Sequence, residues 1–225
     1  LEWNNGSNLI FRKKIEIDNN YLFKINQEVK NNSLEQVELY PYAQLTRKNI
    51  PEDLKNFYIL HEGFIAVLDE ELKEDDYEDI EEKKIVREAS KGWIGITDKY
   101  WMTALIPVAG EKFKSTFLYQ DAYKANFLLN NPKIIAPSAS AKNEIKIFVA
   151  AKEVQTIDAY AEKENIEKLD LIIDWGWFYF FTKPLFFAVD YLFKLTGNFG
   201  IAIVLITIMI RLVFFPLASY SFKSM

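Results

Sequence analysis

One arginine lies inside a long uncharged run near the end of this 225-residue sequence. The run FGIAIVLITIMI (199–210) precedes Arg211, and residues 212–222 that follow it carry no charge either. Insertion scales put an arginine at the centre of a membrane helix at roughly 2.5 to 3.5 kcal/mol, so a charge there indicates a functional site. A positive charge held at membrane depth needs water or a polar group beside it.

The neighbours of Arg211 allow two interpretations. At about 100° per residue, Arg211 shares one helical face, about 40° wide, with Gly200, Thr207 and Ala218. This small and polar face suits close helix contact or a hydrated cleft, and Arg211, Thr207 and Gly200 are the candidate residues that line it. Alternatively, the long side chain of Arg211 snorkels to the headgroups on the side of Lys223. The spacing favours the hydrated cleft.

These groove residues require a helix that crosses the membrane. Residues 199–217 would rise about 28 Å as a helix, close to the hydrocarbon thickness of about 30 Å. We therefore predict a single transmembrane α-helix over 196–220.

A second helix with few charges is predicted just upstream, within 175–195. If 183–195 is helical, its three charged residues fall within roughly 40° of one another, and the remaining residues are apolar or aromatic. A helix with a narrow charged stripe and a broad apolar face lies in the plane of the membrane surface. Tryptophan rings are typical of the headgroup level. The residues that we expect at the membrane interface are Trp175, Trp177, Lys183, Asp190 and Lys194.

The charge distribution divides the chain at Asp174. The 51 residues after it carry five charges and a net charge of +3, whereas residues 1–174 carry the other 54 and a net charge of −8. This contrast predicts a water-exposed domain over 1–174 followed by membrane-embedded sequence. The overall net charge of −5 argues against a direct nucleic-acid partner, which requires a basic face.

Several kinds of catalytic and metal site are excluded by composition. The absence of cysteine excludes disulfides, thiol nucleophiles and thiolate metal sites, and the single histidine, His61, excludes His-pair metal sites and multi-histidine catalysis. His61 could act as a base, but a lone histidine is more often structural. We therefore expect no catalytic residues, no metal and no cofactor. The start at Leu1 and the end at Met225 lead us to expect a fragment of a longer protein.

The water-exposed domain is predicted to be rich in β-strands. Apolar residues alternate with polar ones on both sides of 18–20, which predicts a hairpin. Apolar spacing within 152–169 predicts one short helix. Residues 69–82 hold ten acidic residues and one lysine, and we interpret them as a solvated loop rather than a cation-binding patch. The further strands that we predict are 57–68, 93–97, 100–107, 113–120, 123–129 and 145–151, and together these elements favour an antiparallel sandwich.

These residues carry a resemblance to a known family. The sequence resembles the bacterial YidC branch of the YidC/Oxa/Alb membrane protein insertases over essentially its whole length. The matching residues are Asp174-Trp175-Gly176-Trp177, Lys183-Pro184-Leu185-Phe186, Gly197-Asn198-Phe199-Gly200, Arg211 with Pro216-Leu217, Gly92-Trp93-Ile94, Tyr100-Trp101 and Ala104-Leu105-Ile106-Pro107.

The resemblance implies a specific architecture. Members of the family have a large periplasmic β-sandwich of mutarotase-like topology, a supersandwich, followed by an interfacial helix and further membrane helices in the bacterial inner membrane. This chain would contain a partial periplasmic domain (1–174), the interfacial amphipathic helix (175–195), a transmembrane helix (196–220) and the start of a cytoplasmic hairpin (221–225).

The resemblance also implies a function. Family members insert newly made integral membrane proteins and help them to fold, alone or with the Sec translocon, and ribosomes contact regions that are absent here. The arginine that matches Arg211 sits in a hydrophilic groove open to the cytoplasm and to lipid, where it helps to accept hydrophilic client segments. No bond is made or broken, so the protein would not be an enzyme.

Two alternatives remain at this point. One is a membrane-anchored periplasmic carbohydrate-binding or mutarotase-like domain. Mutarotase-type chemistry uses a pair of histidines together with a carboxylate. His61 is the only histidine in this sequence, which argues against that activity. The other is a structural anchor with an inert domain, which would tolerate Arg211→Ala.

Overall fold

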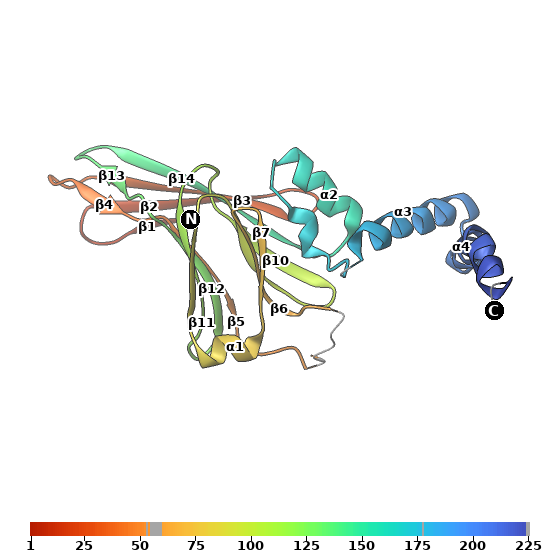
Figure 1. Cartoon of the computed structure of the whole chain (residues 1–225). Helices are drawn as coiled ribbons and strands as arrows, with labels where there is room; N and C mark the ends of the chain where they lie inside the picture. The colour runs from red at the N-terminus through yellow and green to blue at the C-terminus, as the bar shows by residue number, and fades with distance from the viewer. Residues whose placement is uncertain (53, 55–59, 177, 224–225) are drawn as a thin grey trace. The chain divides into compact units, whose positions relative to one another are not determined.

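The structure is a computed structural model that describes residues 1–52, 54, 60–176 and 178–223. The chain forms two compact units, Leu1–Asp174 and Trp175–Met225, which are described separately below. The first unit contains the sheets and the second contains the two long C-terminal helices (Figure 1).

Two antiparallel sheets form the first unit. Within the described residues, the large sheet has eight strands in the order β1-β2-β3-β14-β10-β9-β6-β7, and the small sheet has four in the order β5-β12-β11-β8. The strands of the large sheet are β1 (Glu2–Asn4), β2 (Leu9–Ile17), β3 (Leu22–Asn31), β14 (Ser140–Ala151), β10 (Trp101–Ile106), β9 (Gly92–Thr97), β6 (Gly63–Leu68) and β7 (Glu71–Asp75). Those of the small sheet are β5 (Tyr42–Arg47), β12 (Tyr123–Leu129), β11 (Phe113–Tyr119) and β8 (Ile85–Ala89). A separate pair joins β4 (Val37–Leu39) to β13 (Lys133–Ile135).

The main core lies between the two sheets. Phe64 and Leu105 of the large sheet pack in one buried cluster with Phe117 and Phe127 of the small sheet. The rings of Phe64 and Phe117 lie 4.9 Å apart between centroids, within the range in which aromatic pairs attract one another. Burial of each such side chain contributes about 1.5 to 3 kcal/mol to folding, so this cluster holds the sandwich together.

A second core covers the opposite face of the large sheet. There Trp93 and Phe148 are buried against Ile157 of α2 (Val154–Lys163) and Leu169 of the 3₁₀ helix η1 (Leu169–Ile172). The Trp93 Nε1–H donates to the Glu167 carbonyl oxygen at 3.2 Å, which satisfies the one polar atom of that buried ring. The predicted short helix within 152–169 is therefore present, as the third layer of the domain.

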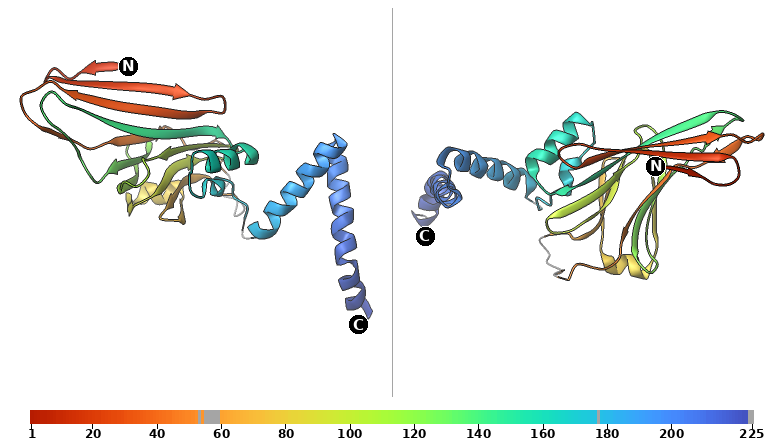
Figure 2. Two further views of the ribbon diagram at one scale, coloured as in Figure 1. Left: turned by 90° about the horizontal axis from the view of Figure 1, so that it is seen from above. Right: turned by 180° about the vertical axis from the view of Figure 1, so that it is seen from behind.

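The predicted hairpin at 18–20 is confirmed. Asp18 Oδ1 accepts the backbone N–H groups of Asn20 and Leu22, each at 3.0 Å, and Tyr21 has a φ of 69°. The strands on either side, β2 and β3, pair over their whole length, and β14 pairs with the other edge of β3. Figure 2 shows these three long strands side by side from two further directions.

The predicted strands at 93–97, 100–107, 113–120, 123–129 and 145–151 are also confirmed, with small shifts at their ends. The strand predicted over 57–68 is confirmed from Gly63 onward as β6, and residues 57–59 lie outside the described residues. The sequence analysis did not predict six strands: β1, β4, β5, β7, β8 and β13.

The interpretation of 69–82 as a solvated loop is wrong. The segment contains β7 and a helix, α1 (Tyr77–Glu82), with Tyr77 and Ile80 buried. Asp69 and Glu70 have φ values of 48° and 73°, which turn β6 tightly into β7. The backbone N–H of Asp76 donates to Asp79 Oδ2 at 3.4 Å at the start of α1. Most of the acidic residues lie on the solvent side of the strand and the helix and hid the amphipathic pattern, whereas Asp75 at the end of β7 is buried.

The second unit consists of α3 (Tyr179–Thr196) and α4 (Phe199–Lys223), joined by two residues. Gly197 ends α3 with a φ of 66°, and its N–H donates to the Phe193 carbonyl oxygen at 2.8 Å. Asn198 begins α4, since its Oδ1 accepts the N–H groups of Gly200 and Ile201 at 2.9 and 3.2 Å. Thus α3 begins four residues before the predicted 183–195 segment, and α4 continues three residues beyond the predicted span.

Candidate functional site

Arg211 lies on α4 with its side chain exposed. Among the described residues it has no hydrogen-bond or ion-pair partner for its guanidinium. The stretch Phe199–Pro216 around it is long and apolar enough to cross a membrane. A guanidinium remains charged at any physiological pH, so within a bilayer it requires water, a lipid phosphate or a polar protein group beside it.

Gly200 and Thr207 share the face of Arg211, because α4 is a continuous helix from Phe199 to Lys223. All three residues are exposed, and about 16 Å separates the levels of Gly200 and Arg211 along the axis. The Thr207 Oγ1–H donates to the Ile203 carbonyl oxygen at 2.7 Å, so its oxygen lone pairs face outward. Ala218, the fourth predicted member of this face, has a side chain outside the described part of the structure.

The predicted interface residues of α3 fall into two pairs. Lys194 Nζ lies 2.6 Å from Asp190 Oδ2, one helical turn away. Lys183 Nζ lies 5.8 Å from the centroid of the Trp175 ring, within cation–π range. Trp177 lies outside the described residues. Each of the three charged groups therefore has a neighbour in the same unit, and their place at the membrane interface stays a prediction.

Trp175 is held in a defined position. Its ring meets that of Phe186 edge-on, with centroids 5.6 Å apart and planes at 72°, and its carbonyl oxygen accepts the Thr182 hydroxyl at 2.8 Å. The indole Nε1 is buried and has no hydrogen-bond partner among the described residues.

His61 makes structural contacts. Its Nε2 lies 2.9 Å from the Phe64 carbonyl oxygen, to which an Nε2–H can donate, and its Nδ1 lies 3.5 Å from Asp76 Oδ1. Its side chain is 12% exposed. These contacts tie the chain before β6 to the start of α1. In the part of the chain that the structure describes, no three histidine or acidic side chains are grouped so that they could hold a metal ion.

Glu164 forms ion pairs with two lysines on the outer face of the large sheet. Its carboxylate lies 2.8 Å from Lys146 Nζ and 3.0 Å from Lys24 Nζ, and its side chain is only 7% exposed. The hydrogen bond from Lys146, together with that from Lys24, holds the pKa of Glu164 below its ordinary value. Elsewhere, burial raises the pKa of Glu74 and lowers the pKa of Lys152, because a charge is less favourable away from water.

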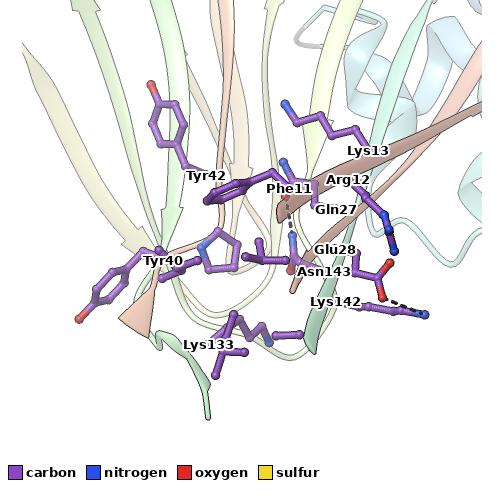
Figure 3. A pocket seen from close by; sticks show the side chains of 15 residues that line it. Phe11, Arg12, Lys13, Gln27, Glu28, Tyr40, Tyr42, Lys133, Lys142 and Asn143 are labelled. Carbon is purple, nitrogen blue, oxygen red and sulfur yellow. Dashed lines mark hydrogen bonds and ion pairs between the residues drawn. The ribbon is translucent and has the colours of Figure 1, made fainter. Parts of the chain in front are cut away.

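The sequence analysis missed a pocket of about 220 Å³ in the first unit (Figure 3). It lies between the β2-β3-β14 part of the large sheet and the segments around β4, β5 and β13, with Phe11, Gln27 and Asn143 among its lining residues. Its residues come from distant parts of the sequence. The only local signal was an amide, Asn143, in the middle of a strand pattern.

Comparison with known proteins identifies the family. Residues 1–188 match the family model described as the YidC periplasmic domain. The chain belongs to this family. The YidC resemblance noted in the sequence is thereby confirmed for the domain that precedes the helices and for the first residues of α3.

Three relatives, each named membrane protein insertase YidC, align with the whole chain. The protein of Pelagibacter ubique is 48% identical, that of Brucella melitensis 42% and that of Bradyrhizobium diazoefficiens 40%. The chain spans 40% of the length of the first YidC relative and 38% of the other two.

Two solved structures share part of the fold of this YidC domain. A galactose mutarotase related enzyme from Lactobacillus acidophilus has a TM-score of 0.45 and 12% identity, and the match covers 66% of each chain. A putative aldose 1-epimerase from Klebsiella pneumoniae has a TM-score of 0.40 and 10% identity, over 76% of this chain and 53% of that one. Because both TM-scores are below 0.5 and both identities are 12% or less, these similarities say nothing about activity.

Proposed function

We propose that the full-length protein is a membrane protein insertase and chaperone, which inserts newly made integral membrane proteins into the bacterial inner membrane and helps them to fold. Two observations support the proposal. The relatives over the whole chain carry the name membrane protein insertase YidC. The observation from the chain itself that carries most weight is that Arg211, within the apolar stretch of α4, has no partner among the residues that the structure describes.

In this proposal, Arg211 faces a water-filled groove together with Thr207 and Gly200. Gly200 leaves room for a close neighbour, and the outward lone pairs of Thr207 offer hydrogen-bond acceptors. The guanidinium provides charge-assisted hydrogen bonds to a polar client segment, which shortens the path of that segment through hydrocarbon. Because the groove is hydrated, each contact is weak enough for the client to leave.

The rest of the chain positions this helix. Trp175, Lys183, Asp190 and Lys194 keep α3 at the membrane surface, and the domain 1–174 lies in the periplasm. Membrane helices beyond this chain complete the groove, and the Sec translocon and the ribosome join as partners through regions of the longer protein. The proposed role involves no covalent step, no cofactor and no metal.

The relatives give no support to the alternative of a carbohydrate-binding or mutarotase-like function, and His61 is occupied by structural contacts. The insertase and an inert anchor differ in whether the Arg211 face is in contact with water. The insertase requires that contact, and the anchor does not. The chain has no cysteine, so single cysteines can be introduced at chosen positions of the full-length protein. Thr207→Cys lies on the Arg211 face, and Leu205→Cys lies about 160° away around the helix.

We expect a membrane-impermeant maleimide, added from the cytoplasmic side, to label the cysteine at 207 but not the one at 205. Labelling of both cysteines after the membrane is solubilised serves as the control for reactivity. If the cysteines at 205 and 207 were equally protected from the maleimide in the intact membrane, the hydrated groove would be contradicted. The helix would then act only as a membrane anchor.

A further inference from the structure

Two neighbouring aromatic residues are exposed at the turn between β9 and β10. Tyr100 is 63% exposed and Trp101 is 61% exposed. The residue before them, Lys99, is also exposed, and its Nζ lies 5.1 Å from the centroid of the Tyr100 ring. A single exposed apolar side chain is ordinary, but a lysine, a tyrosine and a tryptophan in succession form a compact group, which we call the aromatic turn (99–101).

The backbone of the aromatic turn is fixed by the strands around it. The Asp98 N–H donates to the Trp101 carbonyl oxygen at 2.8 Å. The Lys152 N–H, just after β14, donates to the Tyr100 carbonyl oxygen at 2.9 Å. The Asp98 carboxylate lies 2.5 Å from Arg47 Nη1. Because the turn already has one backbone conformation, little entropy is lost when its side chains bind a surface.

The aromatic turn lies at the end of the domain from which the chain continues into the second unit. Thr97, just before the turn, pairs with Gly63 of β6. Two residues before Gly63, the His61 N–H donates to Asp174 Oδ2 at 3.3 Å, and Asp174 is the last residue of the first unit. Burial lowers the pKa of Lys152, and the nearby Asp174 carboxylate opposes this shift, which places Asp174 on the same side of the domain as the turn.

Only a short piece of chain follows this end of the domain. Tyr179, where α3 begins, is five residues after Asp174, and five residues span at most about 18 Å when fully extended. The next step rests on the proposed function, in which α3 lies at the membrane surface. Asp174 then stays within about 18 Å of the headgroups, and weak contacts suffice there because the domain is tethered beside them.

We propose that the aromatic turn binds the phospholipid headgroup layer, with the rings of Tyr100 and Trp101 among the lipid carbonyl groups and the Lys99 ammonium beside a lipid phosphate. Tryptophan and tyrosine rings are typical of this level of a bilayer, and lysine extends its amine to the phosphates. The contact gives the domain 1–174 an attachment to the membrane in addition to α3. Two attachments define the orientation of the domain above the bilayer, which one flexible connection does not.

A bilayer fits the aromatic turn better than a protein partner does. A stable protein–protein interface buries about 800 Å² on each side. One tyrosine or tryptophan side chain buries about 150 to 250 Å², so two rings supply roughly half of that area. A tethered contact with lipid needs no such area, because the membrane-embedded helices already hold the domain near the headgroups.

The test uses the whole chain in vesicles of phosphatidylethanolamine with about one quarter phosphatidylglycerol. The chain has no cysteine, so a nitrobenzoxadiazole fluorophore can be attached at single introduced cysteines. Ala151→Cys places the fluorophore beside Trp101, the cross-strand partner of Ala151, and Leu34→Cys places it beyond the end of β3 that pairs with the start of β14. The measured quantity is the fraction of fluorescence lost when a lipid with a nitroxide on its headgroup is included. We expect quenching at 151 to be several-fold stronger than at 34.

Two double variants separate the aromatic turn from exposed aromatic residues in general. Tyr100→Ser with Trp101→Ser should lower the quenching at position 151 to the level at position 34. Both side chains are more than half exposed, so the fold should persist, and far-ultraviolet circular dichroism checks this. Trp3→Ser with Tyr40→Ser removes two exposed rings near Phe11, away from the turn, and should leave the quenching at 151 unchanged.

Three results would each overturn the proposal. They are equal quenching at 151 and 34, quenching at 151 that survives the loss of both rings, and protection of 151 that rises with the protein-to-lipid ratio, which would show that a second copy of the chain covers the turn. The same fluorophore at Tyr191→Cys reports on α3 separately. Quenching at 191 without quenching at 151 refutes the contact of the turn alone, whereas no quenching at either position also contradicts the surface orientation of α3 in the proposed function.

Discussion

Arg87 and Asp75 join the two sheets of the sandwich through a bidentate ion pair. Arg87 Nη1 lies 2.5 Å from Asp75 Oδ2, and Nη2 lies 2.7 Å from Oδ1. Asp75 is the last residue of β7, at an edge of the large sheet, and Arg87 is in the middle of β8, at an edge of the small sheet. The chain between them forms α1, so this pair closes a short loop across one end of the sandwich.

Arg87→Ala should therefore destabilise the domain. The Asp75 side chain is 8% exposed and that of Arg87 27%, so removal of the arginine leaves a buried carboxylate without its partner. After allowance for the partial exposure of Arg87, we expect the free energy of unfolding to fall by roughly 2 to 4 kcal/mol. Urea denaturation of the chain in detergent micelles, followed by tryptophan fluorescence, measures this change.

Arg12→Ala is the matched control for Arg87→Ala. It removes a similar pair, with Glu2 at 2.7 Å, but both side chains are about half exposed, so its denaturation midpoint should not move. If the two variants unfold at the same urea concentration, the bridge between the sheets does not contribute as described.

Arg211→Ala in the full-length protein should impair insertion more than Arg211→Lys does. Lysine keeps the positive charge on the small and polar face, whereas alanine removes it. A hydrogen bond to a charged group contributes about 1.5 to 3 kcal/mol, so we expect insertion of a client with a polar translocated loop to fall about tenfold or more with alanine.

The measurement for Arg211 is complementation of a depletion strain together with the fraction of client protected from protease. Lys194→Ala, which removes a charge from α3 instead, controls for the loss of a cation near the membrane. Growth with alanine equal to growth with arginine would contradict the proposed role of the guanidinium.

Helix α3 should lie flat at the membrane surface. Its three charges share one stripe, so a crossing orientation would bury them in hydrocarbon. With nitroxide labels attached at Tyr191→Cys and, as a reference, at Ile208→Cys on α4, depth measurements in bilayers should place position 191 at the headgroups and position 208 near the centre. A label at 191 as deep as the one at 208 would show that α3 crosses.

Stability should decrease in acid partly through Glu164. Because Lys146 and Lys24 hold its pKa below the ordinary value, the carboxylate stabilises the folded chain at neutral pH. This contribution is lost as the pH falls through the folded pKa and the carboxylate is protonated. Glu164→Gln should lower the free energy of unfolding by about 1 to 2 kcal/mol at pH 7, because part of the lysine charge is exposed.

Glu164→Gln should also flatten the dependence of stability on pH between neutrality and the acid transition. Glu16→Gln, in an exposed pair with Lys14 on the same sheet, provides the comparison. Urea denaturation at a series of pH values measures both. An unaltered pH profile in Glu164→Gln would rule out this carboxylate as a source of acid sensitivity.

The success of strand prediction depended on the position of each strand in its sheet. Every strand with a described neighbour on both sides was predicted, whereas the edge strands β1, β7, β5 and β8 were missed. An interior strand such as β6 is buried on both faces and reads as a continuous apolar run. An edge strand such as β8 alternates between half-buried and exposed residues and includes Arg87 and Glu88, so its sequence resembles a loop.

The two candidate sites differ in how far the sequence could predict them. The face shared by Gly200, Thr207 and Arg211 depends only on helical spacing within one segment, so periodicity was sufficient. The pocket depends on the register by which Lys13, Gln27 and Asn143 meet across three strands, and Asn143 is more than a hundred residues from the other two. No local pattern contains that pairing, because it is determined by the packing of the whole sheet.

Only two residues, Gly197 and Asn198, join α3 to α4, so the end of α3 fixes the rotation of α4 about its own axis. Gly197 ends α3 and Asn198 begins α4, so no flexible loop lies between the helices that could accommodate an added residue. A single insertion early in α4 would rotate everything downstream by about 100°, so that Arg211 would no longer face the proposed groove. An added residue at this joint would therefore change the direction in which the guanidinium of Arg211 points.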